Sequence, residues 1–159
     1  MKTVVVSDSH GNYRNFKKIL DTNSDADYII HLGDGENDLY DLNIDDSALA
    51  KKIIYVGGNC DMGMHKRTRI VEIDGIRIFL AHGDNYKIKT DKKVIAKAAE
   101  KEGCSAAFFG HSHIRYCETI GGIFLLNPGS CDMQDDGTRP SYAVVTTENG
   151  SISTEFTDL

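Results

Sequence analysis

Ten short runs of β-branched and apolar residues, separated by turn signals, constrain the fold of this chain more than any other feature. Three of the separators are dipeptides typical of two-residue hairpin turns: Asp74-Gly75, Gly121-Gly122 and Asn149-Gly150. The pattern predicts strands at Thr3–Val6, Tyr28–Leu32, Lys52–Val56, Thr68–Ile73, Arg77–Ala81, Ala106–Phe109, Tyr116–Ile120, Ile123–Leu126, Tyr142–Thr147 and Ile152–Phe156.

Helical stretches interrupt these strands. Asn12 is expected to cap a helix that runs to about Leu20, and Thr90 is expected to cap another that ends at Gly103. A weaker helix is expected after Gly35. Strands that first alternate with helices and then form hairpins favour an α/β layered sandwich with mixed sheets.

The composition excludes several classes of protein. Of the 159 residues, 40% are hydrophobic, which fits one domain over residues 1–159 rather than a disordered chain. No apolar run approaches the ~20 residues that cross a bilayer, and the first residues do not resemble a secretory leader. We therefore expect a cytoplasmic protein with no membrane partner.

The net charge and the cysteine spacing exclude further classes of protein. The formal net charge of −6 argues against sequence-specific binding of nucleic acid, because a negative surface repels the phosphate backbone. The four cysteines are widely spaced and form no C-x-x-C pair, so neither a zinc ribbon nor a disulfide framework is indicated. The sequence leaves open whether the protein forms a homo-oligomer.

Side chains that can bind metals follow five of the predicted strands. In chain order these are Asp8 and His10, then Asp34, then Asn59, then His82, and finally His111 and His113. Loops at the carboxyl ends of strands are where ligands collect in α/β sheets, and a glycine in or beside each group lets the chain turn sharply. Each short motif alone is a weak signal, but together they predict one crowded site.

The chemistry of these side chains points to two metal ions. Four imidazoles, two carboxylates and one amide are too many ligands for a single tetrahedral zinc. A mixed set of nitrogen and oxygen ligands suits Mn²⁺, Fe, Ni²⁺ or Zn²⁺ better than Ca²⁺ or Mg²⁺. Two divalent ions would outweigh the two carboxylates and attract a phosphate group, so a phosphate ester is the expected substrate.

The five groups form a recognisable series. They read D-S-H-G from Asp8, G-D-G from Gly33, G-N-C-D from Gly58, H-G-D from His82 and G-H-S-H from Gly110. In this order and spacing the chain resembles the calcineurin-like metallophosphoesterase superfamily. The small size, the G-N-C-D block and the late Asn127-Pro128-Gly129-Ser130 resemble its compact bacterial and archaeal phosphodiesterase branch, the YfcE-like group.

The resemblance implies a fold, an activity and a set of roles. The fold would be a four-layer αββα sandwich of two mixed β-sheets flanked by helices. The activity would be dinuclear metal-dependent hydrolysis of a small phosphodiester, by in-line attack of a metal-bridging hydroxide, with manganese expected and nickel, iron or zinc as alternatives. One metal would be held by Asp8, His10 and His113, the other by Asn59, His82 and His111, with Asp34 as the bridge.

Two residues beside Asn59 carry further expectations. The resemblance places Asp34, Asn59, Cys60 and Asp61 in the catalytic loops. The superfamily has a histidine where this chain has Cys60, and a thiol is a poorer proton donor, so we expect diesters with acidic leaving groups to be preferred. The alternative for Cys60 is a partly buried small side chain. Asp61, like Asp84, is more plausibly a residue that orients its neighbours.

Other residues near the motifs have weaker assignments. His65 and Arg67, together with Asn59, are candidates for binding the substrate, although a solvated basic loop is the commoner explanation. His31 lies inside an apolar strand and is expected to be a hydrogen-bonded core residue rather than a ligand.

Two other functions are alternatives to hydrolysis. A retromer subunit shares this fold and serves as a non-catalytic protein-binding scaffold, and a phosphate- or nucleotide-sensing module is a further alternative. Scaffolds of this kind lose some of the metal ligands. Here every ligand position is filled by a residue able to coordinate a metal, which favours the enzyme.

Overall fold

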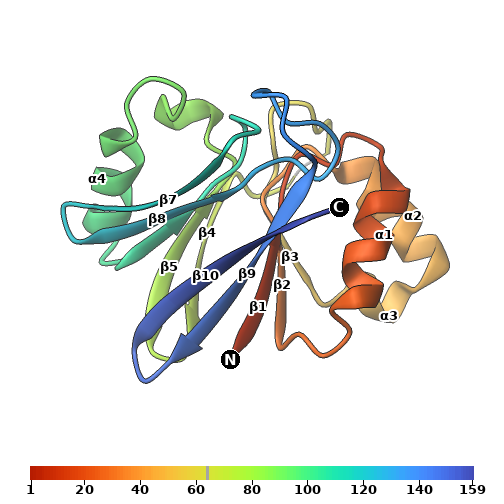
Figure 1. Ribbon diagram of the computed structural model, residues 1–159, viewed down its shortest axis with the longest axis horizontal. Coiled ribbons are helices and arrows are strands. Elements are labelled where there is room, and N and C mark those ends of the chain that lie inside the picture. Colours follow the sequence, from red (N-terminus) through yellow and green to blue (C-terminus); the bar gives the residue numbers. More distant parts are fainter. Residues whose placement is uncertain (64) are drawn as a thin grey trace.

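Two five-stranded mixed β-sheets pack face to face in the computed structural model, and helices cover both outer faces (Figure 1). The structure describes residues 1–63 and 65–159. The expected four-layer αββα sandwich is confirmed. Among the described residues, no helix is long and apolar enough to cross a membrane.

The first sheet contains β1 (Lys2–Val6), β2 (Tyr28–His31), β3 (Ile53–Tyr55), β9 (Ser141–Glu148) and β10 (Ser151–Asp158). Its strand order is β10-β9-β1-β2-β3. The strands β1, β2 and β3 are parallel, whereas β9 is antiparallel to both β1 and β10. The carboxyl ends of the three parallel strands therefore lie at one edge, where the loops that carry Asp8, Asp34 and Asn59 begin.

The second sheet contains β4 (Thr68–Ile73), β5 (Ile76–Ala81), β6 (Ala106–Phe108), β7 (Arg115–Ile120) and β8 (Ile123–Pro128). Its order is β4-β5-β6-β8-β7, with β5, β6 and β8 parallel. The loops that carry His82 and the pair His111 and His113 follow the neighbouring strands β5 and β6. Both sheets thus contribute loops from the carboxyl ends of adjacent parallel strands.

The helices are α1 (Tyr13–Thr22), α2 (Glu36–Asp45), α3 (Ser47–Ala50), the 3₁₀ turn η1 (Asp84–Tyr86) and α4 (Lys93–Lys101). In Figure 1, α1, α2 and α3 lie on one side of the sandwich and α4 on the other. Apolar side chains at helical spacing explain this placement, because Phe16, Ile19 and Leu20 of α1 and Ile95 and Ala99 of α4 are buried.

Three apolar clusters hold the four layers together. The central one lies between the sheets and includes Val5, Ile30, Leu80 and Phe108. A second joins α1 and α2 to the first sheet, and a third joins α4 to the second sheet. Burial of this much apolar surface is the main stabilising contribution, at about 25 cal/mol per Å².

Every predicted strand is present, with ends within two residues of those expected. In the three predicted hairpin turns both central residues have positive φ, as type I′ turns require. Asn12 caps α1, accepting a hydrogen bond from the backbone of Asn15. The expected cap at Thr90 is wrong: α4 begins at Lys93, whose backbone N–H donates to Asp91, while the Thr90 hydroxyl donates to the Lys87 carbonyl.

Candidate metal centre

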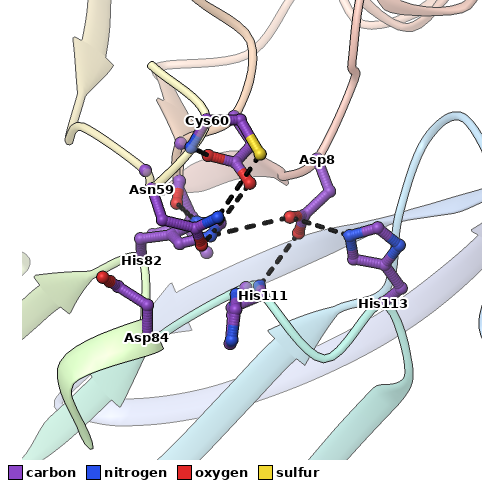
Figure 2. A network of polar contacts seen from close by, with 12 residues as sticks. Asp8, Asn59, Cys60, His82, Asp84, His111 and His113 are labelled. Carbon is purple, nitrogen blue, oxygen red and sulfur yellow. Dashed lines mark hydrogen bonds and ion pairs between the residues drawn. The ribbon is translucent and has the colours of Figure 1, made fainter. Parts of the chain in front are cut away.

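The five predicted groups meet beyond the carboxyl ends of parallel strands from both sheets. Figure 2 shows Asp8, His82 and His113 of this cluster, with Asn59 and His111 beside them. Around Asp8 Oδ1 lie three imidazole nitrogens, with His113 Nε2 at 3.2 Å and the Nε2 atoms of His10 and His82 each at 3.9 Å. His10 Nε2 and His113 Nε2 are themselves 3.2 Å apart. Side chains separated by up to 105 positions in the sequence therefore form one cluster.

Asp8 is the most buried member of this cluster. Its side chain has no exposed surface, and Oδ2 accepts a hydrogen bond of 3.0 Å from the backbone N–H of His111. Oδ1 has no hydrogen-bond partner of good geometry among the residues that the structure describes. A buried carboxylate oxygen without a donor is costly, so this atom is placed as a ligand for a cation would be.

Asp34 lies between the two sets of ligands that the sequence predicted. Its Oδ2 is 3.9 Å from His10 Nε2 and 3.2 Å from His82 Nε2. Its Oδ1 accepts a 2.8 Å hydrogen bond from the backbone N–H of Cys60. Only 3% of the side chain is exposed, so the carboxylate has a fixed orientation with Oδ2 facing both histidines.

Asn59 and His111 complete the set near His82. Asn59 Oδ1 lies 3.2 Å from His82 Nε2, and the ring of His111 lies 5.1 Å from that of His82, centroid to centroid, at an interplanar angle of 68°. On its other side, His82 Nδ1 lies 2.8 Å from the carbonyl oxygen of Leu32, an acceptor that holds a proton on Nδ1 and leaves Nε2 free.

Burial and close charges together set the ionisation of the cluster. Burial opposes the charged form of Asp8, but contacts with His113 and His82 outweigh it and lower its pKa. The pKa of Asp34 is likewise lowered, by His82 and by the Cys60 backbone, against the effect of burial. Burial also opposes the charged form of His82, yet Asp34 and Asp8 raise its pKa, and contact with Asp8 raises that of His113. The two carboxylates and the two imidazoles nearest to them therefore favour each other's charged forms.

The backbone at the cluster adopts an unusual conformation. Asp8, His10, Asp34, His111 and His113 all have φ between 46° and 64°, in the left-handed region. Such a conformation costs about 1–3 kcal/mol per non-glycine residue and is concentrated at functional sites. The five ligand candidates are thus held in conformations that the surrounding contacts must maintain.

Two glycines allow the loops to approach the carboxylates. A Cβ atom on Gly58 would lie 2.0 Å from Asp34 Oδ1, and one on Gly110 would lie 2.7 Å from Asp8 Oδ2. Both distances are far below van der Waals contact. The glycines of the G-N-C-D and G-H-S-H blocks therefore have a steric role that the sequence motif alone does not reveal.

Asp61 organises the loop around Asp34. Its Oδ2 accepts hydrogen bonds from the backbone of Asp34 and Gly58 and from the Tyr55 hydroxyl, and its Oδ1 accepts from the backbone of Gly35 and Glu36. These contacts match the expected orienting role of Asp61. Nothing in the sequence identified Tyr55 as part of this network.

A second buried network lies behind the cluster. His31 Nδ1 accepts from the backbone N–H of Gly33, and His31 Nε2 lies 3.1 Å from Ser9 Oγ, whose hydroxyl donates to Asp38. His31 is fully buried, as expected of a core residue, and burial lowers its pKa to about 4. This network joins the loops after β1 and β2. The sequence did not identify Ser9 and Asp38 as part of the site, because neither side chain is one that the motifs specify.

Cys60 is exposed, so the expectation of a partly buried side chain is wrong. Although the residue is exposed, partial loss of water around the thiol and the nearby Asp34 carboxylate raise the pKa of Cys60 to about 11. A potential ligand atom of Cys60 lies within 4.8 Å of those of His10 and Asp34. These three residues, with Asp61, Glu36 and Met62 among others, line a hollow of about 260 Å³ beside the cluster.

His65 and Arg67 lie outside the described lining of this hollow. His65 Nε2 is 3.0 Å from a carboxylate oxygen of Glu36, and Arg67 donates to the Gly58 carbonyl and to Asp84. Both side chains are therefore paired with protein groups, and their role in binding a substrate stays a prediction.

The donor set fits the binding of metal ions. Three overlapping groups of described residues place three ligand atoms within 4.8 Å of one another: Asp8, His10 and His113; His10, Asp34 and Cys60; and Asp8, Asp34 and His82. His111 and Asn59 flank the last of these. The unpartnered Asp8 Oδ1 is the observation that most favours a cation here.

Comparison with known proteins identifies the family of the chain. The model of the calcineurin-like phosphoesterase superfamily domain matches residues 1–150. The chain belongs to this family. It is 31% identical over 160 residues to the probable metallophosphoesterase YsnB of Bacillus subtilis, covering 99% of this chain and 91% of YsnB. It is 25% identical over 172 residues to the phosphodiesterase YfcE of Escherichia coli K12, covering 91% and 87% of the two chains.

Solved structures agree on the fold. A crystal structure of a predicted phosphoesterase from Streptococcus pneumoniae matches with a TM-score of 0.84 and 25% identity, over 99% of this chain and 88% of that one. A crystal structure of a single mutant of Vps29 from Entamoeba histolytica matches with a TM-score of 0.77 and 23% identity, over 100% and 99% of the two chains. At that identity the second likeness concerns the fold alone.

Proposed function

We propose that this protein is a metal-dependent phosphodiesterase, whose single domain over residues 1–159 holds two divalent transition-metal ions and hydrolyses a small phosphodiester. One observation carries the proposal: three imidazole nitrogens lie within 3.9 Å of a buried carboxylate oxygen that has no hydrogen-bond partner among the described residues. The name of the relative YfcE supports the choice of a diester.

We assign the ligands to two cations, one on each side of the Asp34 carboxylate. Asp8, His10 and His113 would hold one cation, and Asn59, His82 and His111 would hold the other. The position of Asp34 Oδ2, within 3.9 Å of both His10 and His82, supports its role as the bridge. Because the donors are nitrogen and oxygen atoms, manganese is the expected metal, with nickel, iron and zinc as alternatives.

When bound, the two cations would supply Lewis-acid stabilisation of phosphate charge and lower the pKa of a water molecule. The protein itself holds the ligand side chains in place. Asp34 is held by the Cys60 backbone, and Asp61 holds the loops on either side of Asp34 through backbone hydrogen bonds. Preorganised ligands of this kind need little rearrangement during the reaction, which is the main source of electrostatic catalysis.

The hollow lined by His10, Asp34 and Cys60 provides room for one ester substituent. A thiol cannot offer the imidazolium N–H that a histidine at this position would, so Cys60 gives little help to a basic leaving group. The preferred substrates would therefore carry acidic leaving groups, as aryl phosphodiesters do.

The competing function is a protein-binding scaffold of the same fold, or a module that senses phosphate without hydrolysing it. The likeness to Vps29 gives the scaffold its support. The complete set of ligand candidates, brought together by strained backbone conformations, favours the hydrolase.

The test uses protein stripped of metal and resupplied with Mn²⁺, Ni²⁺, Zn²⁺ or Mg²⁺ one at a time. Hydrolysis of bis(4-nitrophenyl) phosphate should appear with a transition metal, and His82→Ala and Asp34→Asn should abolish it while the circular dichroism spectrum is retained. Asp25→Asn, a surface acid that pairs with Lys2, is the matched control and should keep full activity. Metal binding without hydrolysis would indicate a sensor, and no binding would indicate a scaffold.

A further inference from the structure

Asp135 lies next to the cluster although it belongs to none of the five motifs. It comes from the segment between β8 and β9, and its Oδ1 is 3.3 Å from His113 Nδ1. Its Oδ2 is 3.8 Å from Lys89 Nζ. The two carboxylate oxygens therefore face different partners, one of which is a proposed metal ligand.

The two ring nitrogens of His113 face opposite sides. Nε2 points into the cluster, 3.2 Å from both Asp8 Oδ1 and His10 Nε2, whereas Nδ1 faces Asp135. A neutral imidazole carries a proton on one nitrogen and a lone pair on the other. For Nε2 to offer its lone pair to a cation, the proton must be on Nδ1, and an acceptor beside Nδ1 favours that tautomer.

His82 shows the same arrangement within this molecule. Its Nε2 faces Asp34 Oδ2 at 3.2 Å, and its Nδ1 lies 2.8 Å from the Leu32 carbonyl oxygen. His113 instead has a carboxylate oxygen 3.3 Å from Nδ1, and the negative charge of that oxygen favours a proton on the nitrogen that faces it. The two histidines that lie closest to the carboxylates of the cluster thus each have an oxygen acceptor behind the ring.

The residues just before Asp135 in the chain are held in place by hydrogen bonds. The buried amide of Gln134 donates to the Ser130 carbonyl and to Ser141 Oγ, and Asp132 accepts a hydrogen bond from Asn12. These contacts fix the backbone beside a side chain that is itself half-exposed. The carboxylate is therefore presented to His113 from a held position, not from a loose surface loop.

We propose that Asp135 is a positioning residue that keeps the proton of His113 on Nδ1 and fixes the orientation of the ring, so that Nε2 is presented to the first cation. The inference rests on the proposed function, because it takes His113 to be a metal ligand. The competing explanation is a surface acid whose meaningful partner is Lys89, and a pair of that kind contributes little.

The test compares Asp135→Ala, Asp135→Glu and the control Asp136→Ala in the full chain. Asp136 is the adjacent acid, and its side chain accepts hydrogen bonds from Thr138. Titration with Mn²⁺ against a competing chelator should show the affinity for one of the bound ions reduced about 10–100-fold in Asp135→Ala. Asp136→Ala should match the wild type, and Asp135→Glu should recover most of the loss. In zinc-loaded protein, a ¹H–¹⁵N signal from His113 Nδ1–H should be present in the wild type and lost in Asp135→Ala.

Three outcomes would overturn the inference. Equal Mn²⁺ affinity of Asp135→Ala and the wild type would show that the carboxylate does not act through His113. Equal loss in Asp135→Ala, Asp135→Glu and Asp136→Ala would assign the effect to the loop as a whole. Failure of the wild type to bind Mn²⁺ or Zn²⁺ would instead reject the proposed function, and with it the premise of this inference.

Discussion

Replacement of His31 by glutamine should remove a large part of the acid sensitivity of the fold. His31 is completely buried, between the rings of Phe16 and Tyr55, and its Nδ1 accepts a hydrogen bond from the Gly33 backbone. Protonation would put a second donor against that N–H group, in a position without solvent. Burial accordingly lowers the pKa of His31 to about 4, from an ordinary value of 6.5.

The sign and size of the effect follow from proton linkage. As the pH falls below about 6.5, His31 of the unfolded chain takes up a proton that the folded chain does not accept until about pH 4. Within this window the unfolded state binds more protons, so the free energy of unfolding decreases as the pH falls. The gap between the two pKa values corresponds to about 3 kcal/mol.

The assay is urea unfolding of metal-stripped wild type and His31→Gln at a series of pH values from 7 down to 4. Chelator in both samples removes any difference caused by bound metal. The wild-type advantage in unfolding free energy should shrink by about 3 kcal/mol over this range, since glutamine has no group that titrates there. Parallel pH dependence of the two proteins would refute the argument that His31 is held neutral in the fold.

Three further predictions concern the loop that follows β3. Gly58→Ala would put a Cβ atom 2.0 Å from Asp34 Oδ1, so Mn²⁺ affinity in a chelator competition should fall at least about tenfold, whereas Gly57→Ala, with its nearest contact at 3.0 Å, should change it little. Asp61→Asn would turn an amide donor toward backbone donors and should lower the free energy of unfolding in urea by about 2–4 kcal/mol; an unchanged value would contradict the role given to Asp61. Because the thiol of Cys60 is a poor acid, hydrolysis rates of a diester series should fall steeply as the leaving-group pKa rises, and a flat dependence with chemistry rate-limiting would disagree.

The strands were predictable because their signals are local. The β-branched and apolar runs and the hairpin dipeptides between paired strands are both visible in the sequence. The short helix α3 was missed because four residues give no helical period. The start of α4 was misassigned because Thr90 is a capping residue by type, whereas Lys92 occupies the N-cap position and has no side-chain cap hydrogen bond.

The site was predictable to the extent that its residues follow strands. Asp8 and Asp34 follow the adjacent parallel strands β1 and β2, so their convergence was expected. His82 follows β5 of the other sheet and joins them because the two sheets pack face to face. The residues that hold them were not predictable in the same way. Asp38 and Asp135 make their contacts only after distant loops come together, and neither lies at a spacing that distinguishes it from an ordinary surface acid.

The number of metal ions bound per chain tests the central claim most directly. Metal-stripped protein is dialysed against Mn²⁺ at increasing concentration, and bound metal is measured by elemental analysis beside Asp34→Asn. The two-sided position of Asp34 predicts two cations per wild-type chain, with at least one lost in Asp34→Asn while the fold is kept. A folded wild-type protein that holds at most one weakly bound cation would contradict the proposal of a dinuclear phosphodiesterase.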